Sequence, residues 1–185
     1  MKVLVTGGAG FIGSHVITKL LQKQCKVVVI DNLGTGCKEN MPQDVHFIEM
    51  DICSKNLTDI FIKECFDGVI HLAGQTMVPM SLNKPDYDCH INIVGAVNML
   101  EACRKANVKR VVFASSASVY GDTDCVPIRE DATARPASFY GLSKLTVEKY
   151  LQMYHQIFGL EYVILRYANV YGERQSDSGS GGVIS

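Results

Sequence analysis

The sequence of 185 residues lacks the charge pattern of a protein that binds nucleic acid or a membrane surface. It contains no tryptophan, and its 18 Lys and Arg residues are balanced by 19 Asp and Glu residues, which leaves a formal net charge of −1 at pH 7. Without a basic excess, no electrostatic field attracts nucleic acid or anionic lipid. No apolar run approaches the length of a membrane span, and the first one is too short for a signal-peptide core. We therefore expect a cytoplasmic protein with a small or weakly charged partner.

The cysteines and histidines are too scattered to predict a metal centre or a disulfide framework. The seven cysteines, at positions 25, 37, 53, 65, 89, 103 and 125, are never closer together than 12 positions, so the chain has no CxxC pair. An odd number without paired spacing is typical of a reducing compartment, where most cysteines are small buried hydrophobic residues. The five histidines are equally dispersed. We expect no metal site.

Six short apolar runs predict β-strands that are covered on both faces. They are rich in β-branched residues and bounded by Gly, Asp or Asn, which is typical of parallel strands. Segments with helical spacing separate the runs, and parallel strands need such crossover helices. The alternation predicts an α/β fold with a doubly wound parallel sheet, the Rossmann fold, in strand order 3-2-1-4-5-6. The runs span Lys2–Thr6, Lys26–Asp31, Val45–Met50, Gly68–Leu72, Arg110–Ala114 and Glu161–Arg166.

Two of the predicted helices are long. One should span about 85–107, with Val94 and Leu100 among its inward residues. The other should span about 138–158 and end at Gly159, which fits a C-terminal cap. Beyond the last predicted strand, residues 176–185 are rich in Ser and Gly and have no core-forming pattern.

A glycine-rich stretch, TGGAGFIGSH, follows the first predicted strand. Gly8, Gly10 and Gly13 fit the pattern GxGxxG, and Gly7 with the last two fits GxxGxxG. Glycine permits a tight turn, lets backbone amides approach a pyrophosphate and lets the next helix pack close to the strand. The helix N-terminus adds about half a positive charge toward the phosphates. The pattern indicates a dinucleotide site, although taken alone it fits a tight strand-to-helix turn equally well.

Asp31 supports the dinucleotide interpretation, because it ends the second predicted strand 18 residues after Gly13. A carboxylate there can accept both hydroxyls of an adenosine ribose and would repel a 2′-phosphate, so we expect NAD rather than NADP. The alternative is an ordinary residue that ends a strand. Asp51 and Ile52 follow the third strand and are placed to contact the adenine edge, and the small residues of HLAGQ, after the fourth, would let backbone lie along the cofactor.

Three side chains predict acid–base chemistry at the carboxyl ends of the strands. Tyr140 and Lys144 are four residues apart on a predicted helix and so share a face. An adjacent ammonium and a positively charged nicotinamide would lower the pKa of the phenol from about 10 toward about 7, where it can act as a base. Ser116, after the fifth strand, would bridge a substrate hydroxyl and Tyr140. The alternatives are a surface lysine beside a half-buried tyrosine, and a serine-rich turn that satisfies its own backbone.

Six motifs occur in order along the chain: TGGAGFIGSH, DNLGTG, HLAGQ, SSASVYG, YGLSK and RYANVYG. With them, residues 2 to about 172 resemble the extended short-chain dehydrogenase/reductases, and within these the NAD-dependent nucleotide-sugar epimerase/dehydratase family. The motifs are specific for the superfamily and say little about the sugar.

The resemblance implies an enzyme that epimerises a nucleotide sugar at carbon 4, of the UDP-glucose/UDP-galactose type, with NAD as cofactor. Tyr140 would remove the 4-hydroxyl proton while hydride passes to NAD, Ser116 would bridge the two oxygens, and Lys144 would lower the tyrosine pKa and hold the nicotinamide ribose. The substrate would lie beside Ser116, Ser118 and Asn169. Pattern and resemblance together assign the cofactor contacts to Gly7, Gly10, Phe11, Ile12, Gly13, Asp31, Asn32, Asp51, Ile52, Leu72, Ala73, Gly74, Asn92, Tyr140, Lys144 and Tyr167.

Two departures from the family pattern bear on the reaction. Ser116-Ala117-Ser118 stands where the sugar dehydratases have Thr-Asp-Glu, which argues against a 4,6-dehydratase. Thr76 stands where some 4-epimerases have a lysine that touches the cofactor, which leaves UDP-glucuronate and UDP-N-acetylhexosamine 4-epimerases open, and also a decarboxylase. A rival from another class is a non-catalytic module that senses NAD.

The resemblance also implies a domain division and a homodimer. We expect residues 1–172 to form the NAD-binding domain with the catalytic residues, and residues 173–185 to be the start of a truncated substrate domain. In the resembling enzymes, the outer faces of the two long helices pair across a dimer. We expect Met99, Met153 and Tyr154 to be exposed on these faces.

Overall fold

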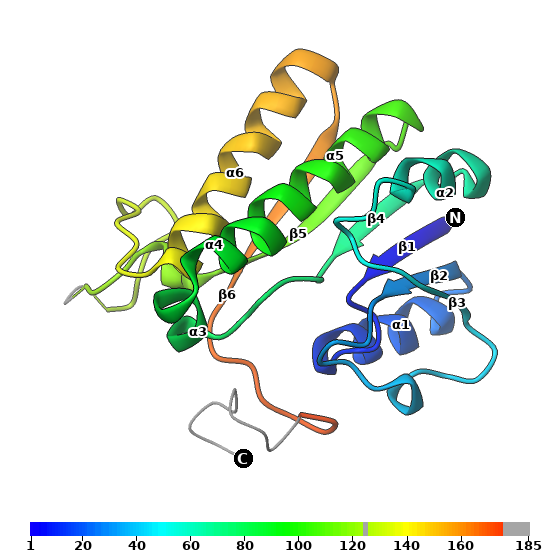
Figure 1. Cartoon of the computed structure of the whole chain (residues 1–185), viewed down its shortest axis with the longest axis horizontal. Coiled ribbons are helices and arrows are strands. Elements are labelled where there is room, and N and C mark those ends of the chain that lie inside the picture. Colours follow the sequence, from blue (N-terminus) through cyan, green and yellow to red (C-terminus); the bar gives the residue numbers. More distant parts are fainter. Residues whose placement is uncertain (124–125, 176–185) are drawn as a thin grey trace.

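The computed structural model describes residues 1–123 and 126–175, which form a parallel sheet of six strands (Figure 1). Neighbouring strands follow the order β3-β2-β1-β4-β5-β6, which confirms the predicted order. Every pairing between neighbours is parallel, so the carboxyl ends of all six strands meet at one edge. The strands are β1 (Lys2–Thr6), β2 (Lys26–Asp31), β3 (His46–Glu49), β4 (Gly68–His71), β5 (Arg110–Ser116) and β6 (Glu161–Tyr167).

Helices connect the strands and cover both faces of the sheet. The α-helices are α1 (Phe11–Gln22), α2 (Leu57–Glu64), α3 (Val78–Asn83), α4 (Pro85–Asp88), α5 (Gly95–Lys105) and α6 (Phe139–Phe158). Shorter turns are η1 (Lys38–Asn40), the π-helical η2 (Cys89–Val94) and η3 (Ala117–Val119). None of the helices in the two described ranges has the length and apolar character that a membrane crossing requires. Of the predicted segment 173–185, residues 176–185 lie outside the described residues.

Side chains alternate along the strands and so build two cores, one on each face of the sheet. Leu4 and Ile30 point to the face that α2, α5 and α6 cover, where they join a buried cluster with Phe113. Val5 and Val29 point to the opposite face, against α1. Figure 1 shows α5 and α6 lying side by side over one half of the sheet, away from α1.

The predicted helix at 85–107 differs from the structure because its turns are not uniform. The backbone keeps a right-handed helical conformation through α4, η2 and α5, and this helical segment ends at Lys105. A π-helical turn takes an extra residue, which rotates the side chains that follow. Val94 is therefore 48% exposed, against the prediction, while Leu100 is buried as predicted. Asn92, within the same turn, points inward and is buried.

One of the three side chains expected on exposed helix faces lies there. Met153 is 49% exposed, but Met99 and Tyr154 are buried, because both pack into the core between α5 and α6. The prediction of an exposed Met99 and Tyr154 is therefore wrong. The large apolar side chains that α6 does expose are Phe139, Leu142, Tyr150, Met153, Ile157 and Phe158.

A buried ion pair joins α6 to the outer strands. The two carboxylate oxygens of Glu148 accept from Arg166 on β6, with Nε at 3.0 Å and Nη2 at 2.6 Å. Ser115 on β5 donates to Glu148 at 2.5 Å, and Arg166 also donates to the Tyr120 hydroxyl at 2.8 Å. The pair thus fixes α6, β5, β6 and the turn after β5 relative to one another.

We predict that Glu148→Ala lowers the free energy of unfolding by about 3 kcal/mol, because it leaves the Arg166 charge without its buried partner. The value is at the low end for a broken buried pair, since the Arg166 side chain keeps 25% exposure. Urea unfolding measures it. Asp131→Ala is the control, because it breaks a fully exposed pair with Arg129, which solvent screens and which adds little to stability. Equal losses in both variants would contradict the structural role of Glu148.

Candidate active site

The glycine turn between β1 and α1 is built on close backbone contacts. Gly7 has φ +71°, and a Cβ there would lie 2.6 Å from the backbone nitrogen of Ala73, which follows β4. A Cβ on Gly13 would collide with the Gly7 carbonyl and lie 2.6 Å from Gly8 Cα. The Cβ position of Gly10 meets only the Gly7 oxygen, at 3.3 Å. Packing within the protein therefore requires glycine at positions 7 and 13, but much less at position 10.

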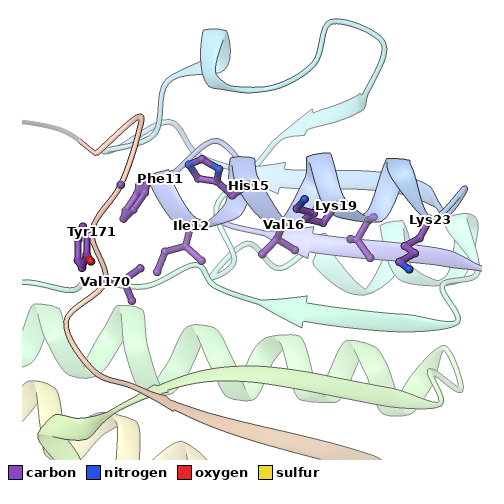
Figure 2. Close-up of a pocket in the computed structure, with 10 residues that line it drawn as sticks. Phe11, Ile12, His15, Val16, Lys19, Lys23, Val170 and Tyr171 are labelled. Atoms are coloured by element: carbon purple, nitrogen blue, oxygen red, sulfur yellow. The ribbon is translucent and has the colours of Figure 1, made fainter.

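The first turn of α1 lies at the carboxyl edge of the sheet (Figure 1). The helix begins at Phe11 with no side-chain cap, which leaves its first backbone amides without intrahelical partners. Figure 2 shows Phe11 and Ile12 at this end of α1, next to Val170 and Tyr171 from the segment after β6. These residues line part of an apolar groove of about 500 Å³ along α1. Phe11 and Ile12 are among the predicted cofactor contacts, whereas the predicted catalytic side chains do not line this groove.

Asp31 ends β2 and holds the glycine turn in place. Its Oδ2 accepts from the amide of Ala9 at 3.0 Å, and its Oδ1 accepts from the amide of Leu33 at 2.9 Å. Asp31 thus does serve as a residue that ends a strand, and each carboxylate oxygen keeps a further lone pair. Asn32 donates to Asp51 at 2.9 Å, which ties the end of β2 to the residues after β3.

The residues after β4 run between the glycine turn and the helices of the opposite half. The Leu72 amide donates to the Thr6 carbonyl at 3.0 Å, which keeps this segment beside the end of β1. A Cβ on Gly74 would lie 2.7 Å from Asn92 Oδ1 and 3.5 Å from Lys144 Nζ. Gly74 therefore lets the backbone pass directly against both side chains.

Ser116, Tyr140 and Lys144 come together from β5 and α6. The hydroxyl of Ser138 caps α6 by accepting from the Gly141 amide at 3.1 Å. A Cβ on Gly141 would collide with backbone of η3, so glycine lets the start of α6 pack on the turn that follows Ser116. Ser116 lies close enough to Tyr140 to lower the pKa of the phenol, and Lys144 Nζ lies 5.7 Å from the centroid of the Tyr140 ring. The structure thus brings the three predicted catalytic residues together.

Burial dominates the protonation of these groups. Lys144 is 4% exposed and donates to the Ala114 carbonyl at 3.1 Å, and burial lowers its pKa to about 8. Burial raises the pKa of Tyr140 above its ordinary value, and the nearby Ser116 offsets only part of this rise. In the protein without a cofactor, burial thus keeps the pKa of Tyr140 above its ordinary value. The expected lowering, which requires both the Lys144 ammonium and an oxidised nicotinamide, stays a prediction.

His71 is a buried residue of this edge to which sequence reasoning gave no role. Its Nδ1 lies 2.7 Å from the hydroxyl of Thr6, and its ring stacks on Phe113 with centroids 5.9 Å apart. Burial, and then the charge of Lys144, lower the pKa of His71 to about 3, so the imidazole is neutral at pH 7. A neutral imidazole leaves Lys144 as the cation of this pocket.

A buried network of amides and a carboxylate joins the β4 segment to the helices. Asn92 Oδ1 accepts from the Gln75 amide at 2.9 Å, and its Nδ2 donates to the Gln75 carbonyl and to Asp88 Oδ1, each at 3.0 Å. The same Nδ2 lies 3.3 Å from Ser143 Oγ on α6. Gln75 Nε2 donates to Asp88 Oδ1 at 2.8 Å. Sequence reasoning missed Asp88, because its burial depends on contacts with Gln75 and Asn92 that local spacing does not show.

The other predicted site residues lie around this centre. Ser118 donates its amide to Ser116 Oγ at 3.1 Å, and Tyr167 pairs in register with Ser116 across β5 and β6. Asn169 lies beyond the end of β6 and is exposed, and Ile52 is buried. Within residues 1–123 and 126–175, no three His, Cys, Asp or Glu side chains are grouped so that they could hold a metal ion.

Comparison with known proteins identifies the family. The sequence profile of the NAD dependent epimerase/dehydratase family matches residues 3–185. The chain belongs to this family. The resemblance inferred from the six motifs is thereby confirmed. The chain spans 60% and 52% of the length of two curated relatives that it matches at 46% and 40% identity, from Methanocaldococcus jannaschii and Corynebacterium glutamicum.

Three solved structures show how closely the family fold is kept. A Thermus thermophilus UDP-glucose 4-epimerase complex with NAD is 43% identical, with a TM-score of 0.94 over 97% of this chain and 58% of that one. A Thermotoga maritima UDP-glucose 4-epimerase with UDP-glucose is 41% identical, with a TM-score of 0.96 over 99% and 60%. A Methanobrevibacter ruminantium UDP-N-acetylglucosamine 4-epimerase in complex with UDP-N-acetylmuramic acid is 38% identical, with a TM-score of 0.91 over 96% and 58%. One architecture thus serves different sugars.

We predict that Gly13→Ala lowers the free energy of unfolding by about 1–3 kcal/mol, because its Cβ overlaps backbone that cannot move aside. Gly10→Ala is the matched control. Position 10 is the N-cap of α1 with φ −76°, which alanine adopts without strain, so its cost should be about 0.5–1 kcal/mol, the preference of an N-cap for Gly over Ala. Urea unfolding of both variants tests this difference. A Gly10→Ala loss as large as that of Gly13→Ala would show that packing requires glycine at both positions.

Proposed function

We propose that the chain binds NAD at the carboxyl edge of the sheet. The fit rests on the uncapped amides at the start of α1, on a Gly10 whose Cβ direction is nearly free of protein atoms, and on the remaining lone pairs of Asp31. The amides would hold the pyrophosphate, and Asp31 would accept hydrogen bonds from the ribose hydroxyls. The negative charge of Asp31 would exclude a 2′-phosphate. The backbone of residues 72–74 would lie along the dinucleotide, with Tyr167 beside the nicotinamide.

The observation that carries the proposed reaction is the convergence of Ser116, Tyr140 and Lys144 on this same edge. When bound, NAD supplies a reversible acceptor for the hydride of carbon 4. Tyr140 takes the proton of the 4-hydroxyl and later returns it, while Ser116 holds that oxygen in line with the phenol. Lys144 keeps a positive charge near the phenolate. We therefore propose epimerisation of a nucleotide sugar at carbon 4, carried out in the cytoplasm by the protein that contains this chain.

A UDP-sugar is the proposed substrate class. The Thermotoga maritima structure, with a TM-score of 0.96, contains UDP-glucose. The Methanobrevibacter ruminantium structure, with a TM-score of 0.91, is a complex with UDP-N-acetylmuramic acid. UDP-glucose and UDP-galactose are our first candidates, since two of the three compared structures are UDP-glucose 4-epimerases. UDP-N-acetylhexosamine is the second candidate, on the strength of the third structure.

A homodimer is proposed through the outer face of α6. Leu142, Tyr150, Met153 and Ile157 recur there at helical spacing, and each is at least 40% exposed. An exposed apolar stripe of this kind, interrupted at Thr146, is typical of a helix that packs against another protein surface.

Gly10→Ala should weaken NAD binding by about tenfold or more, because its methyl group would enter the space proposed for the pyrophosphate. Isothermal titration calorimetry with NAD measures the change, and the small stability effect expected of the same variant ensures that the loss is not one of folding. Unchanged NAD affinity would show that the glycine turn does not hold the pyrophosphate.

Tyr140→Phe should reduce turnover about 10²-fold to 10⁴-fold, because it removes the proposed base, while NAD affinity stays unchanged. Formation of the 4-epimer from UDP-glucose and from UDP-N-acetylglucosamine is the assay. Tyr150→Phe is the control, since it removes a hydroxyl from the exposed face of the same helix. Full activity of Tyr140→Phe would refute its role. A wild-type protein that binds NAD and converts neither sugar would instead favour the NAD-sensing alternative.

A further inference from the structure

Asp88 is a buried carboxylate that the proposed reaction does not use. It lies on α4 and is 1% exposed. Its Oδ1 accepts from Gln75 and Asn92, at 2.8 Å and 3.0 Å. Its Oδ2 is buried and, among the residues that the structure describes, has no hydrogen-bond partner. A buried charged oxygen without a donor is costly, so its retention calls for a compensating charge nearby.

Lys144 has the complementary need in the same pocket. Its ammonium has three donors, of which one is used by the Ala114 carbonyl at 3.1 Å. The network around Asp88 comes near this ammonium without a direct bond, because the Cβ position of Gly74 lies 2.7 Å from Asn92 Oδ1 and 3.5 Å from Lys144 Nζ. The negative charge of Asp88 acts on Lys144 through space and opposes the lowering of its pKa by burial.

We propose that Asp88 is a positioning residue of the active site, whose buried carboxylate is the counter-charge that keeps the Lys144 ammonium charged and in place beside Tyr140. The inference rests on the proposed function of Lys144. It assigns to Asp88 a task at one remove from the reacting atoms, since Asp88 acts through Lys144 and through the Gln75 and Asn92 contacts that hold the β4 segment.

The other groups around Lys144 cannot take this role. His71 on β4 is neutral at pH 7, since burial and the Lys144 charge lower its pKa to about 3. Tyr140 on α6 is uncharged at neutral pH, since burial raises its pKa. Glu148, one turn further along α6, is committed to Arg166 at 2.6 Å and 3.0 Å. Among the described residues, Asp88 on α4 is thus the negative charge that acts on Lys144.

The first test is the titration of Lys144 itself in the 185-residue chain, which needs neither NAD nor turnover. Its Cε resonance can be assigned by its loss in Lys144→Met and followed with pH by NMR. Asp88→Asn keeps the shape of the side chain and removes the charge, so the midpoint should fall by about one pH unit. Asp86→Asn is the matched control, because it removes an exposed carboxylate from the same helix. An unchanged midpoint in Asp88→Asn, or an equal shift in Asp86→Asn, would overturn the proposal.

The second test keeps the proposal falsifiable if Asp88→Asn folds poorly. Asp88→Asn, Lys144→Met and the double variant form a cycle of urea unfolding midpoints. If the two charges compensate each other, the double variant should be at least as stable as either single variant, since neither buried charge is left alone. Additive losses would overturn the proposal. Failure of epimerase activity in all assays would count against the proposed function and leave both of these readouts intact.

Discussion

Close backbone contact at the carboxyl edge of the sheet is the constraint on which the rest of the molecule depends. Gly7 is so near the residues after β4 that a Cβ would lie 2.6 Å from Ala73 N, and Gly13 is equally crowded by the turn itself. Gly74 repeats the arrangement against Asn92 and Lys144. With side chains at these positions, α1, the β4 segment and α6 could not meet at one edge. The amides of α1 and the phenol of Tyr140 would then not share a crevice.

The parallel sheet could be predicted from the sequence because its signal is local. Each strand is a short β-branched run, each connection has helical spacing, and handedness leaves few topologies. The features that could not be predicted depend on which side of a helix each residue faces. The π-helical turn at Cys89–Val94 takes an extra residue, so Val94 is exposed against the prediction. The spacing of apolar residues does not predict a π-helical turn. Met99 and Tyr154 were misplaced because two helices that cover a sheet also bury the sides that face each other.

The candidate site likewise contains residues whose proximity could be predicted and residues whose contacts could not. Ser116, Tyr140 and Lys144 could be predicted, because their positions follow from a strand end and from a four-residue spacing on one helix. The groups that support them could not, because burial of a charge is a tertiary property. In the sequence, Glu148 resembles a surface residue of α6, but in the structure it is buried against Arg166 of β6, with Nη2 at 2.6 Å. Asp88 likewise reads as a solvent-facing residue until Gln75 and Asn92 enclose it.

The same burial decides when the site can act as a base. Desolvation raises the pKa of Tyr140 and lowers that of Lys144 to about 8, so in the protein alone the phenol keeps its proton at neutral pH while most of the ammonium remains charged. A further positive charge in the crevice is therefore needed before the phenolate is favoured. The oxidised nicotinamide ring carries one. On the proposed function, the crevice becomes basic where that ring lies, and proton removal is tied to the presence of the hydride acceptor.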